Sequence, residues 1–513
     1  MKNVSIGVLG HVDCGKTSLV RILSTTLSTA SLDRHPQSRS RGITLDLGFS
    51  CIDREDDHGE SQTITLVDCP GHASLLRTII CGSRIVDGMM LVIDASKGIQ
   101  TQTAECIVIG EVVNINHVLV VFNKADLVDE ASLQATEQKV LKTLAKTKFQ
   151  VFATVRVAAA PREGNALGIE SLKQKLFQFV DSIPSQSSGA EDRITVLAVD
   201  HVFPIKGQGT VLTGTVLGGV VRVGMELEFP TTARGFVRKV KTIQCFHRSV
   251  SVAGKGARVG LSIDRLDSNI PERQFAASPP GAIEVSNVLI GSIFPVSYYR
   301  QPIKSMAKFQ LHVGHDVVDA RLTLLSEGAD DEESPKPLIE KEFLREQELE
   351  HRDDRRYFAV FELEKRVCVI LNSIAVGTKL DTDPKSNACR IAFSSIVMHS
   401  MDESWRRMLR IHTQKRREGE IDRVVNSKEA ICKNLFSREN NQPVFIGMKV
   451  DVQNSAQDST SMVRARIDGT FGKSGKVRLV ATEGQFSESH VGCLVSLEYK
   501  KMTGREGSKS FAQ

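Results

Sequence analysis

Short apolar runs alternate with polar, helix-competent segments over the first part of the chain. Val4–Leu9 is an apolar run that leads into Gly10, and a helix-competent stretch from Lys16 to Leu27 follows it. Further β-rich runs are Thr63–Val67, Met89–Ile93, Val118–Phe122 and Val151–Val157. Strands that alternate with helices in this way favour a mostly parallel sheet covered by helices on both faces.

A last helix and a linker end this alternation. Apolar residues recur at helical spacing over Glu170–Ser182, which predicts that helix. Pro184 ends it, and the polar stretch Ser185–Arg193 is typical of a linker. We therefore expect the first domain to span residues 1–192.

Beyond the linker the pattern changes to short alternating runs with glycine turns. Such runs over residues of about 194–280 predict a small β-barrel, and a similar series spans about 283–400. We expect two barrel domains, at 193–280 and 281–402.

The second series is interrupted by a charged segment between residues 327 and 356. Glu327–Glu333 is acidic, and Glu340–Arg356 is charged and competent to form a helix. Because such segments are usually solvated, we expect an exposed insertion there.

The last part of the chain, residues 403–513, is also β-rich. Its runs are Pro443–Val450, Val463–Ile467, Lys476–Val480 and Leu494–Tyr499. They fit one more small barrel, so the expected fold class is an α/β domain followed by three small β-barrel domains.

A basic stretch opens this last domain. Trp405–Arg417 contains no acid, and its cations are Arg406, Arg407, Arg410, Lys415, Arg416 and Arg417. A stripe of this kind is typical of contact with RNA phosphates. A solvated strand or linker is the alternative.

Composition agrees with a large globular protein. The chain has 513 residues, 41% hydrophobic and 25% charged, and its formal charge of +5 permits contact with nucleic acid without requiring it. None of the ten cysteines forms a C-x-x-C pair, which argues against a zinc cluster or a disulfide framework. With neither a signal-peptide layout nor an apolar run of about 18 residues, we expect a cytoplasmic protein without a membrane span.

The turn after the first apolar run fits the phosphate-binding pattern G-x4-G-K-[ST]. Its glycines let the backbone curl so that successive N–H groups face a polyphosphate. Lys16 is placed to reach the outer phosphates, and the hydroxyl of Thr17 to ligate magnesium. The nucleotide-binding residues expected here are Gly10, Asp13, Cys14, Gly15, Lys16, Thr17 and Ser18. An ordinary glycine turn is the alternative, which the position between a strand and a helix disfavours.

A second motif, Asp68-Cys69-Pro70-Gly71-His72, follows another apolar run. Asp68 would stand at the end of a strand and face magnesium through water. The N–H of Gly71 is placed to bond the terminal phosphate, and His72 to orient the attacking water as the catalytic residue. A lone histidine after a strand is more often structural, but its place beside D-x-P-G favours the catalytic role.

A third motif, Asn123-Lys124-Ala125-Asp126, directly follows the apolar run Val118–Phe122. The carboxylate of Asp126 is able to accept two hydrogen bonds from guanine, a donor pair that adenine lacks, so it selects GTP over ATP. Asn123 is expected to brace the loop. After the next strand comes the tripeptide Ala158-Ala159-Ala160, whose backbone N–H groups are candidates for bonding the guanine carbonyl, with Ala158 and Ala159 among the expected nucleotide-binding residues.

Between the first two motifs lies Arg41-Gly42-Ile43-Thr44. Thr44 could complete magnesium coordination when the terminal phosphate is bound and release it after hydrolysis. The tetrapeptide alone does not distinguish such a switch from a plain turn, but its position in the motif order favours the switch. The expected cofactors are GTP and Mg²⁺, with Thr17, Thr44 and Asp68 at the metal.

These motifs, in this order, resemble those of the translational GTPases related to EF-Tu. Pro36–Ser50 resembles the switch segment of the selenocysteine-specific elongation factors of eukaryotes and archaea, through its L-D-L-G-F continuation. Asp200–Thr215 is similar to the opening of the second domain in that family, and Lys308–His315 to a segment of the third. The resemblance covers nearly the whole chain and weakens toward the C-terminus.

The resemblance also implies a pocket for selenocysteine. A selenol is more acidic than a thiol, so a pocket that selects it should offer fixed positive charge and directed N–H donors. Arg258 would supply the charge and His201 a further donor. Asp200 would orient both, and Phe49 would form an apolar wall. The alternative is that Asp200 and His201 cap a strand and that Arg258 is a surface charge.

As a whole, the resemblance implies a monomeric GTPase that carries selenocysteinyl-tRNA to the ribosome. Its last domain would contact the tRNA and proteins bound to the selenocysteine insertion element of the messenger RNA. A GTPase that carries general or initiator tRNA is a rival, which the fourth domain and the lack of paired cysteines disfavour. A second rival is a GTP-binding scaffold without hydrolysis, which the full set of metal and catalytic candidates disfavours.

Overall fold

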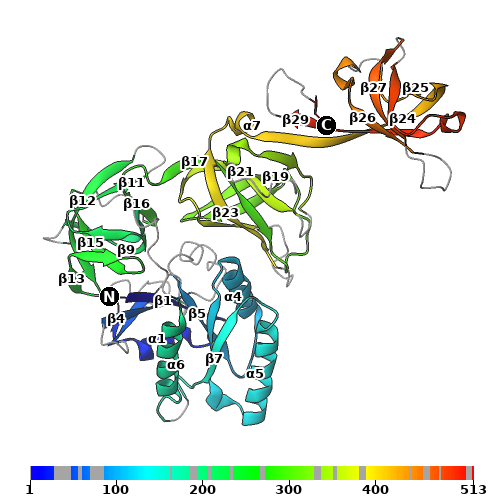
Figure 1. The fold of residues 1–513 in the computed structure, drawn as a ribbon. Helices are drawn as coiled ribbons and strands as arrows, with labels where there is room; N and C mark the ends of the chain where they lie inside the picture. Colours follow the sequence, from blue (N-terminus) through cyan, green and yellow to red (C-terminus); the bar gives the residue numbers. More distant parts are fainter. Residues whose placement is uncertain are drawn as a thin grey trace. The chain divides into compact units, whose positions relative to one another are not determined.

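The structure is a computed structural model, and its chain divides into two compact units. Unit 1 comprises Met1–Leu322 with Ala359–Asp402, and unit 2 comprises Thr323–Phe358 with Glu403–Gln513 (Figure 1). The described residues are 2–27, 48–55, 61–69, 86–161, 164–184, 194–205, 209–230, 235–265, 272–327, 337–349, 355–379, 389–437, 442–453, 463–472, 475–503 and 511–512.

A seven-stranded sheet forms the centre of the first domain. Its strands are β1 (Lys2–Gly10), β2 (Thr26–Leu27), β3 (Gly48–Glu55), β4 (Ser61–Asp68), β5 (Gly88–Asp94), β6 (His117–Asn123) and β7 (Gln150–Arg156). Their order is β2-β3-β4-β1-β5-β6-β7, and the pairs from β4 to β7 are parallel. Only β2 and β3, at one edge, pair antiparallel. The prediction of a mostly parallel sheet is confirmed.

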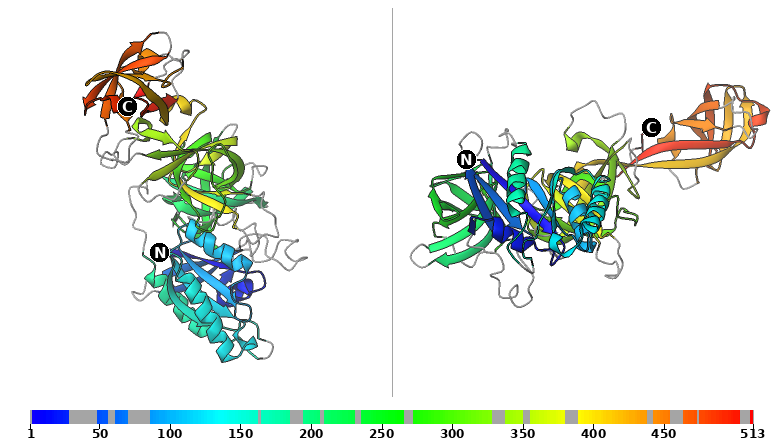
Figure 2. Two further views of the ribbon diagram at one scale, coloured as in Figure 1. Left: turned by 90° about the vertical axis from the view of Figure 1, so that its right-hand side faces the viewer. Right: turned by 90° about the horizontal axis from the view of Figure 1, so that it is seen from below.

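Helices cover both faces of this sheet, also as predicted. They are α1 (Lys16–Leu23), α4 (Thr101–Val112), α5 (Glu130–Leu144) and α6 (Ile169–Ser182), with a 3₁₀ turn, η1, at Ala125–Leu127. The apolar residues of α1 and α6 share one core cluster with β1 and β4 (Figures 1 and 2). Those of α4 and α5 share another, on the opposite face. Burial on both faces explains why the strands are continuous apolar runs rather than alternating ones.

The first helix is shorter than predicted. It ends at Leu23 rather than Leu27, because Ser24 adopts an extended backbone conformation while its N–H still bonds the carbonyl of Val20. The next residues turn to strand pairing, since the backbone and side chain of Thr25 both donate to the carbonyl of Cys51. β-Branched threonines fit such an edge strand better than the last turn of a helix.

The middle of helix α4 is buried all round, whereas Thr101, Ala104 and Glu105 near its start are exposed. Cys106–Gly110 are five consecutive buried residues, which a helix with one apolar stripe cannot provide. One side of the helix covers the sheet. The same core cluster also includes Val376 and Ile391 from the third domain, so this helix joins the two domains through apolar contact.

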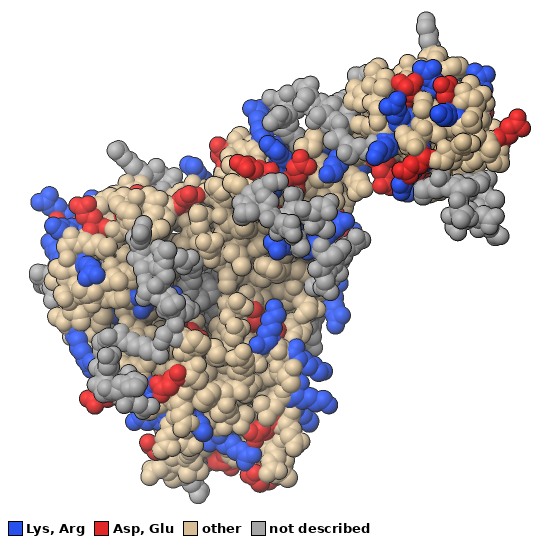
Figure 3. Space-filling model, in the orientation of Figure 1, with Lys and Arg blue, Asp and Glu red and all other residues tan. Residues whose placement is uncertain are grey.

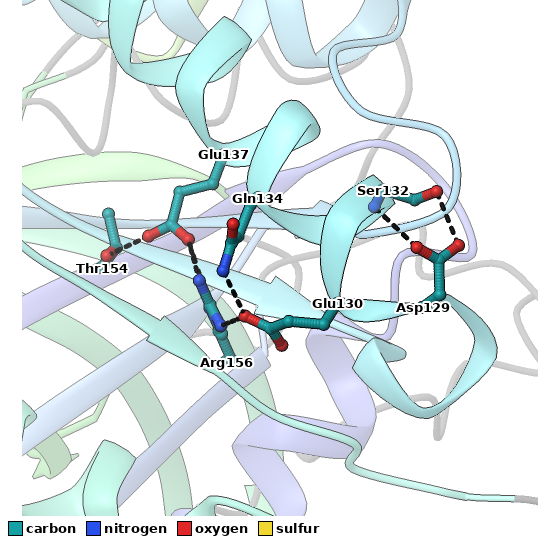
Figure 4. Close-up of polar contacts among 7 residues, drawn as sticks. All are labelled: Asp129, Glu130, Ser132, Gln134, Glu137, Thr154 and Arg156. Atoms are coloured by element: carbon teal, nitrogen blue, oxygen red, sulfur yellow. Dashed lines mark hydrogen bonds and ion pairs between the residues drawn. The ribbon is translucent and has the colours of Figure 1, made fainter.

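A polar network connects α5 to the end of β7 (Figure 4). The carboxylate of Asp129 caps α5 by accepting from the N–H of Ser132 at 2.9 Å. Arg156, the last residue of β7, bridges Glu130 and Glu137 at 2.7 Å each. Thr154 donates to the same Glu137. The network fixes the carboxyl end of β7, from which the loop at Ala158 and Ala159 starts.

The second domain is a closed six-stranded barrel. The elements of the domain are β8 (Thr195–Ile205), β9 (Gly209–Gly218), β10 (Val220–Arg222), β11 (Glu226–Phe229), β12 (Phe236–Cys245), β13 (Arg248–Val250), β14 (Val252–Gly254), β15 (Arg258–Ile263) and β16 (Gln274–Ser278). The order β11-β16-β8-β9-β15-β12 closes through pairing of β11 with β12. Leu197, Val199 and Leu261 are among the side chains that fill its interior.

The third domain closes in the same way. Its strands are β17 (Glu284–Pro295), β18 (Lys308–Val313), β19 (Asp316–Glu327), β21 (Arg356–Val369), β22 (Ile374–Thr378) and β23 (Ile391–Met401). They lie in the order β18-β22-β23-β17-β21-β19, and β18 pairs with β19 to close the ring. The strands β19 and β21 run from unit 1 into unit 2.

The expected helix at Glu340–Arg356 is absent from its described part. That part contains a 3₁₀ turn, η4 (Leu338–Glu340), and a strand, β20 (Glu342–Arg345), which pairs with β19 and with β24. Phe343 is fully buried and meets Phe358 edge to face. Side chains that alternate between buried and partly exposed suit a strand, so tertiary pairing has overridden the local helix tendency.

Unit 2 ends in a third closed barrel. The remaining elements of unit 2 are α7 (Trp405–Met408), β24 (Arg410–Asn426), β25 (Glu429–Lys433), η5 (Gln442–Phe445), β26 (Lys449–Val452), β27 (Val463–Phe471), β28 (Lys476–Glu483), η6 (Glu488–His490), β29 (Leu494–Thr503) and β30 (Phe511–Ala512). The barrel order is β24-β25-β28-β27-β26-β29, closed by β24 with β29. The predicted class, an α/β domain followed by three barrels, is confirmed. None of the described helices is long and apolar enough to cross a membrane.

Candidate functional site

The G-x4-G-K-[ST] loop connects β1 to α1. Gly10 and Gly15 have φ angles of 152° and 92°, which side-chain-bearing residues rarely adopt. A Cβ at Gly10 would lie 2.2 Å from the carbonyl oxygen of Val92, and one at Gly15 would lie 2.2 Å from Nδ2 of Asn123. Both glycines are therefore required for the loop to pack against the neighbouring strand ends.

The ammonium of Lys16 is held at this loop. Its Nζ donates to the carbonyl of Gly10 at 3.0 Å and to that of His11 at 2.7 Å. A phosphate oxygen is a stronger acceptor than a carbonyl, because its charge strengthens the hydrogen bond. The lysine is thus held where a bound polyphosphate would compete for it.

Thr17 and Asp68 meet at the ends of α1 and β4. The hydroxyl of Thr17 donates to Oδ2 of Asp68 at 2.6 Å, and Asp68 is fully buried. The parallel pairing of β1 with β4 brings these two residues together, although they are 51 positions apart. Two hard oxygen donors at the phosphate loop fit Mg²⁺, which binds few protein ligands beside nucleotide phosphates.

The thiols around this loop are buried and inert. Burial raises the pKa of Cys14, raises that of Cys69, and raises that of Cys106 to about 12. A protonated, buried thiol is neither a nucleophile nor a metal ligand. These cysteines pack the loop against the sheet.

Asn123 joins the phosphate loop to the loop after β7. Its Nδ2 donates to the carbonyl of Cys14 at 2.8 Å, and its Oδ1 accepts from the N–H of Ala159 at 3.0 Å. One buried amide thus fixes both loops, which confirms the expectation that Asn123 braces the site.

The neighbouring Lys124 and Asp126 differ in their surroundings. Lys124 has a φ of 60° and forms an ion pair with buried Asp94 at 2.8 Å. Burial alone would raise the pKa of Asp94, but hydrogen bonds from Lys124 and Ser96 outweigh it and hold that pKa below its usual range. Asp126 lies in η1 and is exposed, so its carboxylate is accessible to a base.

The N–H groups of Ala158 and Ala159 are already engaged. Ala158 donates to the carbonyl of Leu167 at 3.0 Å, and Ala159 donates to Asn123. The sequence interpretation of both as donors to guanine therefore needs correction, because each N–H has a partner within the protein. Ala160 is the remaining residue of this tripeptide. Thr44, Gly71 and His72 lie outside the described residues.

A second constellation lies on the outer face of the second-domain barrel. The β8–β9 pairing shifts its register between Val199 and His201, which leaves Asp200 as a bulge. Asp200 forms an ion pair with Arg258, the first residue of β15. Arg258 is 5% exposed, and its guanidinium lies 3.8 Å from the ring centre of Phe49 on β3.

The alternative interpretation of Arg258 as a surface charge is therefore wrong. Its guanidinium is buried between a carboxylate and an aromatic face, an arrangement that stabilises a desolvated cation. Its Nη1 also lies 3.4 Å from Oγ1 of Thr215. Its Nη2 is buried without a hydrogen-bond partner among the described residues. His201 is less enclosed, with Nδ1 3.8 Å from a carboxylate oxygen of Glu272.

Thr213 is a residue of this face that sequence reasoning missed. It pairs with Gly260 and His201, and its side chain shares the outer face with Thr215 and Arg258. Its hydroxyl is buried and, within the part of the chain that is described, has no hydrogen-bond partner. A polar residue at every second position of Thr213-Gly214-Thr215 was the available signal for a polar outer face.

The basic stretch of the last domain divides into one cation that packs within the barrel, Arg417, and others that are exposed. Arg417 is committed to the barrel: its guanidinium lies 5.2 Å and 5.4 Å from the ring centres of Phe436 and Phe445, and Nε donates to Tyr499 at 3.1 Å. Arg406 stacks on Trp405. The exposed Arg416 is 3.1 Å from Glu418.

Cations and acids alternate over the visible face of this last barrel, at the upper right of Figure 3. Two ion pairs of this barrel join Arg464 to Glu483 at 3.0 Å and Arg478 to Asp468 at 2.7 Å. The visible face is thus mixed in charge rather than a continuous basic field. Any RNA contact would depend on a few local cations.

The phosphate loop, the Thr17–Asp68 pair and the Asn123-Lys124-Ala125-Asp126 motif gather at the carboxyl ends of parallel strands, and three barrels follow. This combination defines a GTP-binding elongation factor of the translational GTPase class, with GTPase activity. The model of the elongation factor Tu GTP binding domain matches residues 1–199. The third-domain model of eukaryotic selenocysteine-specific elongation factors matches 290–395, and the eEFSec C-terminal RIFT domain matches 407–512.

Individual proteins agree with these family models. The mouse selenocysteine-specific elongation factor is 37% identical, covering 98% of this chain and 92% of that protein. The one from Methanocaldococcus jannaschii is 33% identical over 75% of this chain and 77% of its own length. The structure of SelB from Methanococcus maripaludis with the GTP analogue GPPNHP superposes with a TM-score of 0.73 at 26% identity, covering 98% and 99% of the two chains. This chain belongs to the family of selenocysteine-specific elongation factors.

Proposed function

We propose that this protein binds selenocysteinyl-tRNA in its GTP form, delivers it to the ribosome at recoded UGA codons and hydrolyses GTP there. The observation that carries the proposal is the buried guanidinium of Arg258, held by Asp200 and covered by Phe49. A buried cation with a donor nitrogen to spare suits an anionic amino-acid side chain. The family relationship supports the same function.

The pocket would separate selenocysteine from serine by charge. A selenolate is anionic at neutral pH, and it would accept hydrogen bonds from Nη2 of Arg258 and from the hydroxyl of Thr213. Serine is neutral and would leave the buried Nη2 of the guanidinium without an anionic acceptor. A site whose buried donors stay unpaired rejects the wrong substrate strongly. His201 would be a further donor at the more open side.

The phosphate loop and its neighbours would bind and hydrolyse GTP. Water attacks the terminal phosphorus, the bond to the bridging oxygen breaks, and GDP, phosphate and a proton leave. Lys16 would neutralise charge on the transferred group, and Asp126 would select guanine. We propose His72 as the residue that orients the water and Gly71 as a donor to the terminal phosphate. The N–H of Ala160, rather than those before it, would bond the guanine carbonyl.

Magnesium would be held by Thr17 and, through water, by Asp68, with Thr44 added in the GTP form. When bound, the ion neutralises charge that develops on the phosphate oxygens. Before it binds, the hydroxyl of Thr17 donates to the carboxylate of Asp68. That hydrogen bond keeps both oxygens at one point beside the phosphate loop.

We further propose the wider setting of this activity. The four domains would be residues 1–192, 193–280, 281–402 and 403–513. The protein would act in the cytoplasm as a monomer, and its partners would be the ribosome and proteins bound to the selenocysteine insertion element of the messenger RNA. The last domain would contact the tRNA.

Salt dependence of tRNA binding tests the contact with the last domain. The proposed phosphate contacts are Arg406, Arg407, Arg410, Lys415 and Arg416. Replacing one of them, as in Arg416→Ala, should reduce the slope of log affinity against log salt by about 1. Arg417→Ala should instead destabilise the barrel, because it removes stacking on Phe436 and Phe445. An unchanged slope in all five variants would exclude this surface.

Competitive binding tests the proposed function itself. Selenocysteinyl-tRNA and the same tRNA charged with serine are compared with a non-hydrolysable GTP analogue, using the native protein and Arg258→Ala. We expect a strong preference for selenocysteine that the variant loses, by about 100-fold, because a charge-assisted pair contributes roughly 2–3 kcal/mol. Equal binding of the two forms by the native protein would leave a general tRNA-carrying GTPase.

A further inference from the structure

The hairpin between β18 and β19 brings the third domain against the second. Val313 pairs with Asp316, so Gly314 and His315 form its two-residue turn. Gly314 has a φ of 54°, and a Cβ there would lie 2.7 Å from Cε2 of Phe275 on β16. The turn therefore rests directly on the outer face of the second barrel, at the strand beside β8.

His315 makes two contacts on that face. Its ring centre lies 4.5 Å from that of Phe275, and its ring hydrogen-bonds the backbone of Gln274. Burial lowers the pKa of His315 to about 4, so the imidazole is neutral at physiological pH. A neutral imidazole that serves as a hydrogen-bond donor in a fixed direction is a positioning group rather than a charge.

The strand that His315 contacts closes over the bulge at Asp200. Gln274 pairs with Val199, and the N–H of Arg273 donates to the carbonyl of Asp200 at 3.2 Å. Among the charged groups that act on the His315 ring, Asp200 has the largest influence, followed by Arg273 and Asp316. The turn of the third domain, the start of β16 and the Asp200 bulge therefore form one contiguous structure.

We propose that His315 is a positioning residue for selenocysteine selection: by holding Gln274, it fixes the Asp200 bulge and through it the direction of the Arg258 guanidinium. The inference rests on the proposed function of this pocket. The third domain would then help to determine specificity, although none of the third domain's residues would touch the amino acid. A bulge re-aims side chains, and its closing strand decides how firmly it does so.

Loss of the His315 hydrogen bond would reduce the preference for selenocysteine more than the affinity for selenocysteinyl-tRNA. Arg258 would keep its charge, so selenocysteinyl-tRNA would still bind. Its donor nitrogens would no longer be held in one direction, and the preference for selenocysteine would fall. Misplacement of about 1 Å at such a group is sufficient for a large loss of specificity.

The test compares substitutions that separate packing from hydrogen bonding. His315→Phe keeps a ring against Phe275 and removes the hydrogen bond, while His315→Gln keeps a donor at similar reach. The readout is the ratio of dissociation constants for the serine- and selenocysteine-charged forms of one tRNA, in the full-length protein with a non-hydrolysable GTP analogue. We expect the ratio to fall about tenfold in His315→Phe and to stay within about twofold of native in His315→Gln.

Two controls keep the interpretation unambiguous. His399→Phe changes an exposed histidine on β23 of the same barrel and should leave the ratio unchanged. If His315→Phe does not fold, His315→Leu, which is apolar and has no hydrogen-bond donor, should give the same tenfold fall. Equal changes in both affinities, or an unchanged ratio, would mean that His315 only joins the two barrels, and would overturn the inference. A native protein without preference for selenocysteine would overturn the proposed function instead.

Discussion

The nucleotide site and the proposed selenocysteine pocket at Arg258 are built on opposite plans. The nucleotide site uses backbone groups and short motifs where neighbouring parallel strands end, so each motif is contiguous in sequence. The pocket uses single side chains from four antiparallel strands of two domains. Phe49 comes from β3, Asp200 from β8, Thr213 from β9 and Arg258 from β15.

This difference changes what each site tolerates. A backbone cradle depends on conformation, so its vulnerable positions are glycines such as Gly10 and Gly15, where a Cβ has no room. The pocket depends on charge and direction, so its vulnerable positions are side chains that the barrel fold itself does not need. Substitutions in the nucleotide site should therefore reduce GTP affinity and stability, whereas substitutions in the pocket should reduce selectivity for selenocysteine.

The largest expected effect is at Asp126, the proposed base-selecting residue of the nucleotide site. Asp126→Asn exchanges an acceptor for a donor opposite the guanine N–H groups. GTP affinity should fall by about 100-fold or more, because two charge-assisted hydrogen bonds of roughly 1.5–3 kcal/mol each are lost. Xanthosine triphosphate, with a carbonyl at that position, should regain much of the loss. Titration with fluorescent analogues of both nucleotides measures it, and a variant that still prefers GTP contradicts the assignment.

A backbone substitution should come next. Gly15→Ala places a Cβ at a φ of 92° and 2.2 Å from Nδ2 of Asn123. We expect a loss of roughly 2–3 kcal/mol in unfolding free energy together with weaker GTP binding. Gly98→Ala is the matched control, since its φ is 67° but the nearest atom to its Cβ is 3.5 Å away. Similar losses in both variants would assign the effect to φ alone and not to the contact with Asn123.

Thr213→Val should have a smaller effect than Gly15→Ala, and it should weaken tRNA binding without lowering stability. The variant removes a buried hydroxyl that has no partner in the described structure, so stability should stay equal or rise by about 1 kcal/mol. Binding of selenocysteinyl-tRNA should weaken by about fivefold with GTP affinity unchanged. Thermal unfolding and tRNA competition together measure this divergence. Selectivity at native level in the variant would remove Thr213 from the pocket.

The smallest effect should arise in the network that supports β7. Burial alone would raise the pKa of Glu137, but hydrogen bonds from Thr154 and Arg156 outweigh it and lower that pKa. A carboxyl whose pKa is lowered by folding stabilises the protein above its unfolded-state pKa, near 4.5, and loses that contribution as pH falls further. Glu137→Gln should cost about 0.5–1 kcal/mol at pH 7 and almost nothing at pH 3.5. Denaturant unfolding at the two pH values measures it, and a cost independent of pH would exclude the ionic origin.

Sequence reasoning succeeded where chemistry lies in contiguous motifs. Asn123 was predicted as a brace from N-K-x-D as the third motif in order, and its hydrogen bonds to Cys14 and Ala159 agree with that prediction. Such motifs predict a site because the carboxyl ends of parallel strands lie at one edge of the sheet, whatever their separation along the chain.

It failed where pairing across the barrel or tertiary burial decides the outcome. Thr213 resembles any strand threonine until its pairing with Gly260 and His201 places it beside Arg258. Arg417 resembled an RNA-binding cation, but aromatic rings of its own barrel occupy it. The helix expected after Glu340 became a strand because Phe343 is buried beside Phe358.

Because α4 is largely apolar, the contact between the first and third domains should respond to temperature more than to salt. Added salt would hardly change the apolar cluster that α4 shares with Val376 and Ile391, although Glu111 of the same helix also hydrogen-bonds Tyr298 of the third domain. Apolar association weakens on cooling, because its driving force near room temperature is almost entirely entropic. Low temperature should therefore loosen the first domain from the third, whereas salt should loosen the protein from its RNA. Temperature and ionic strength would then separate two steps of the same delivery cycle.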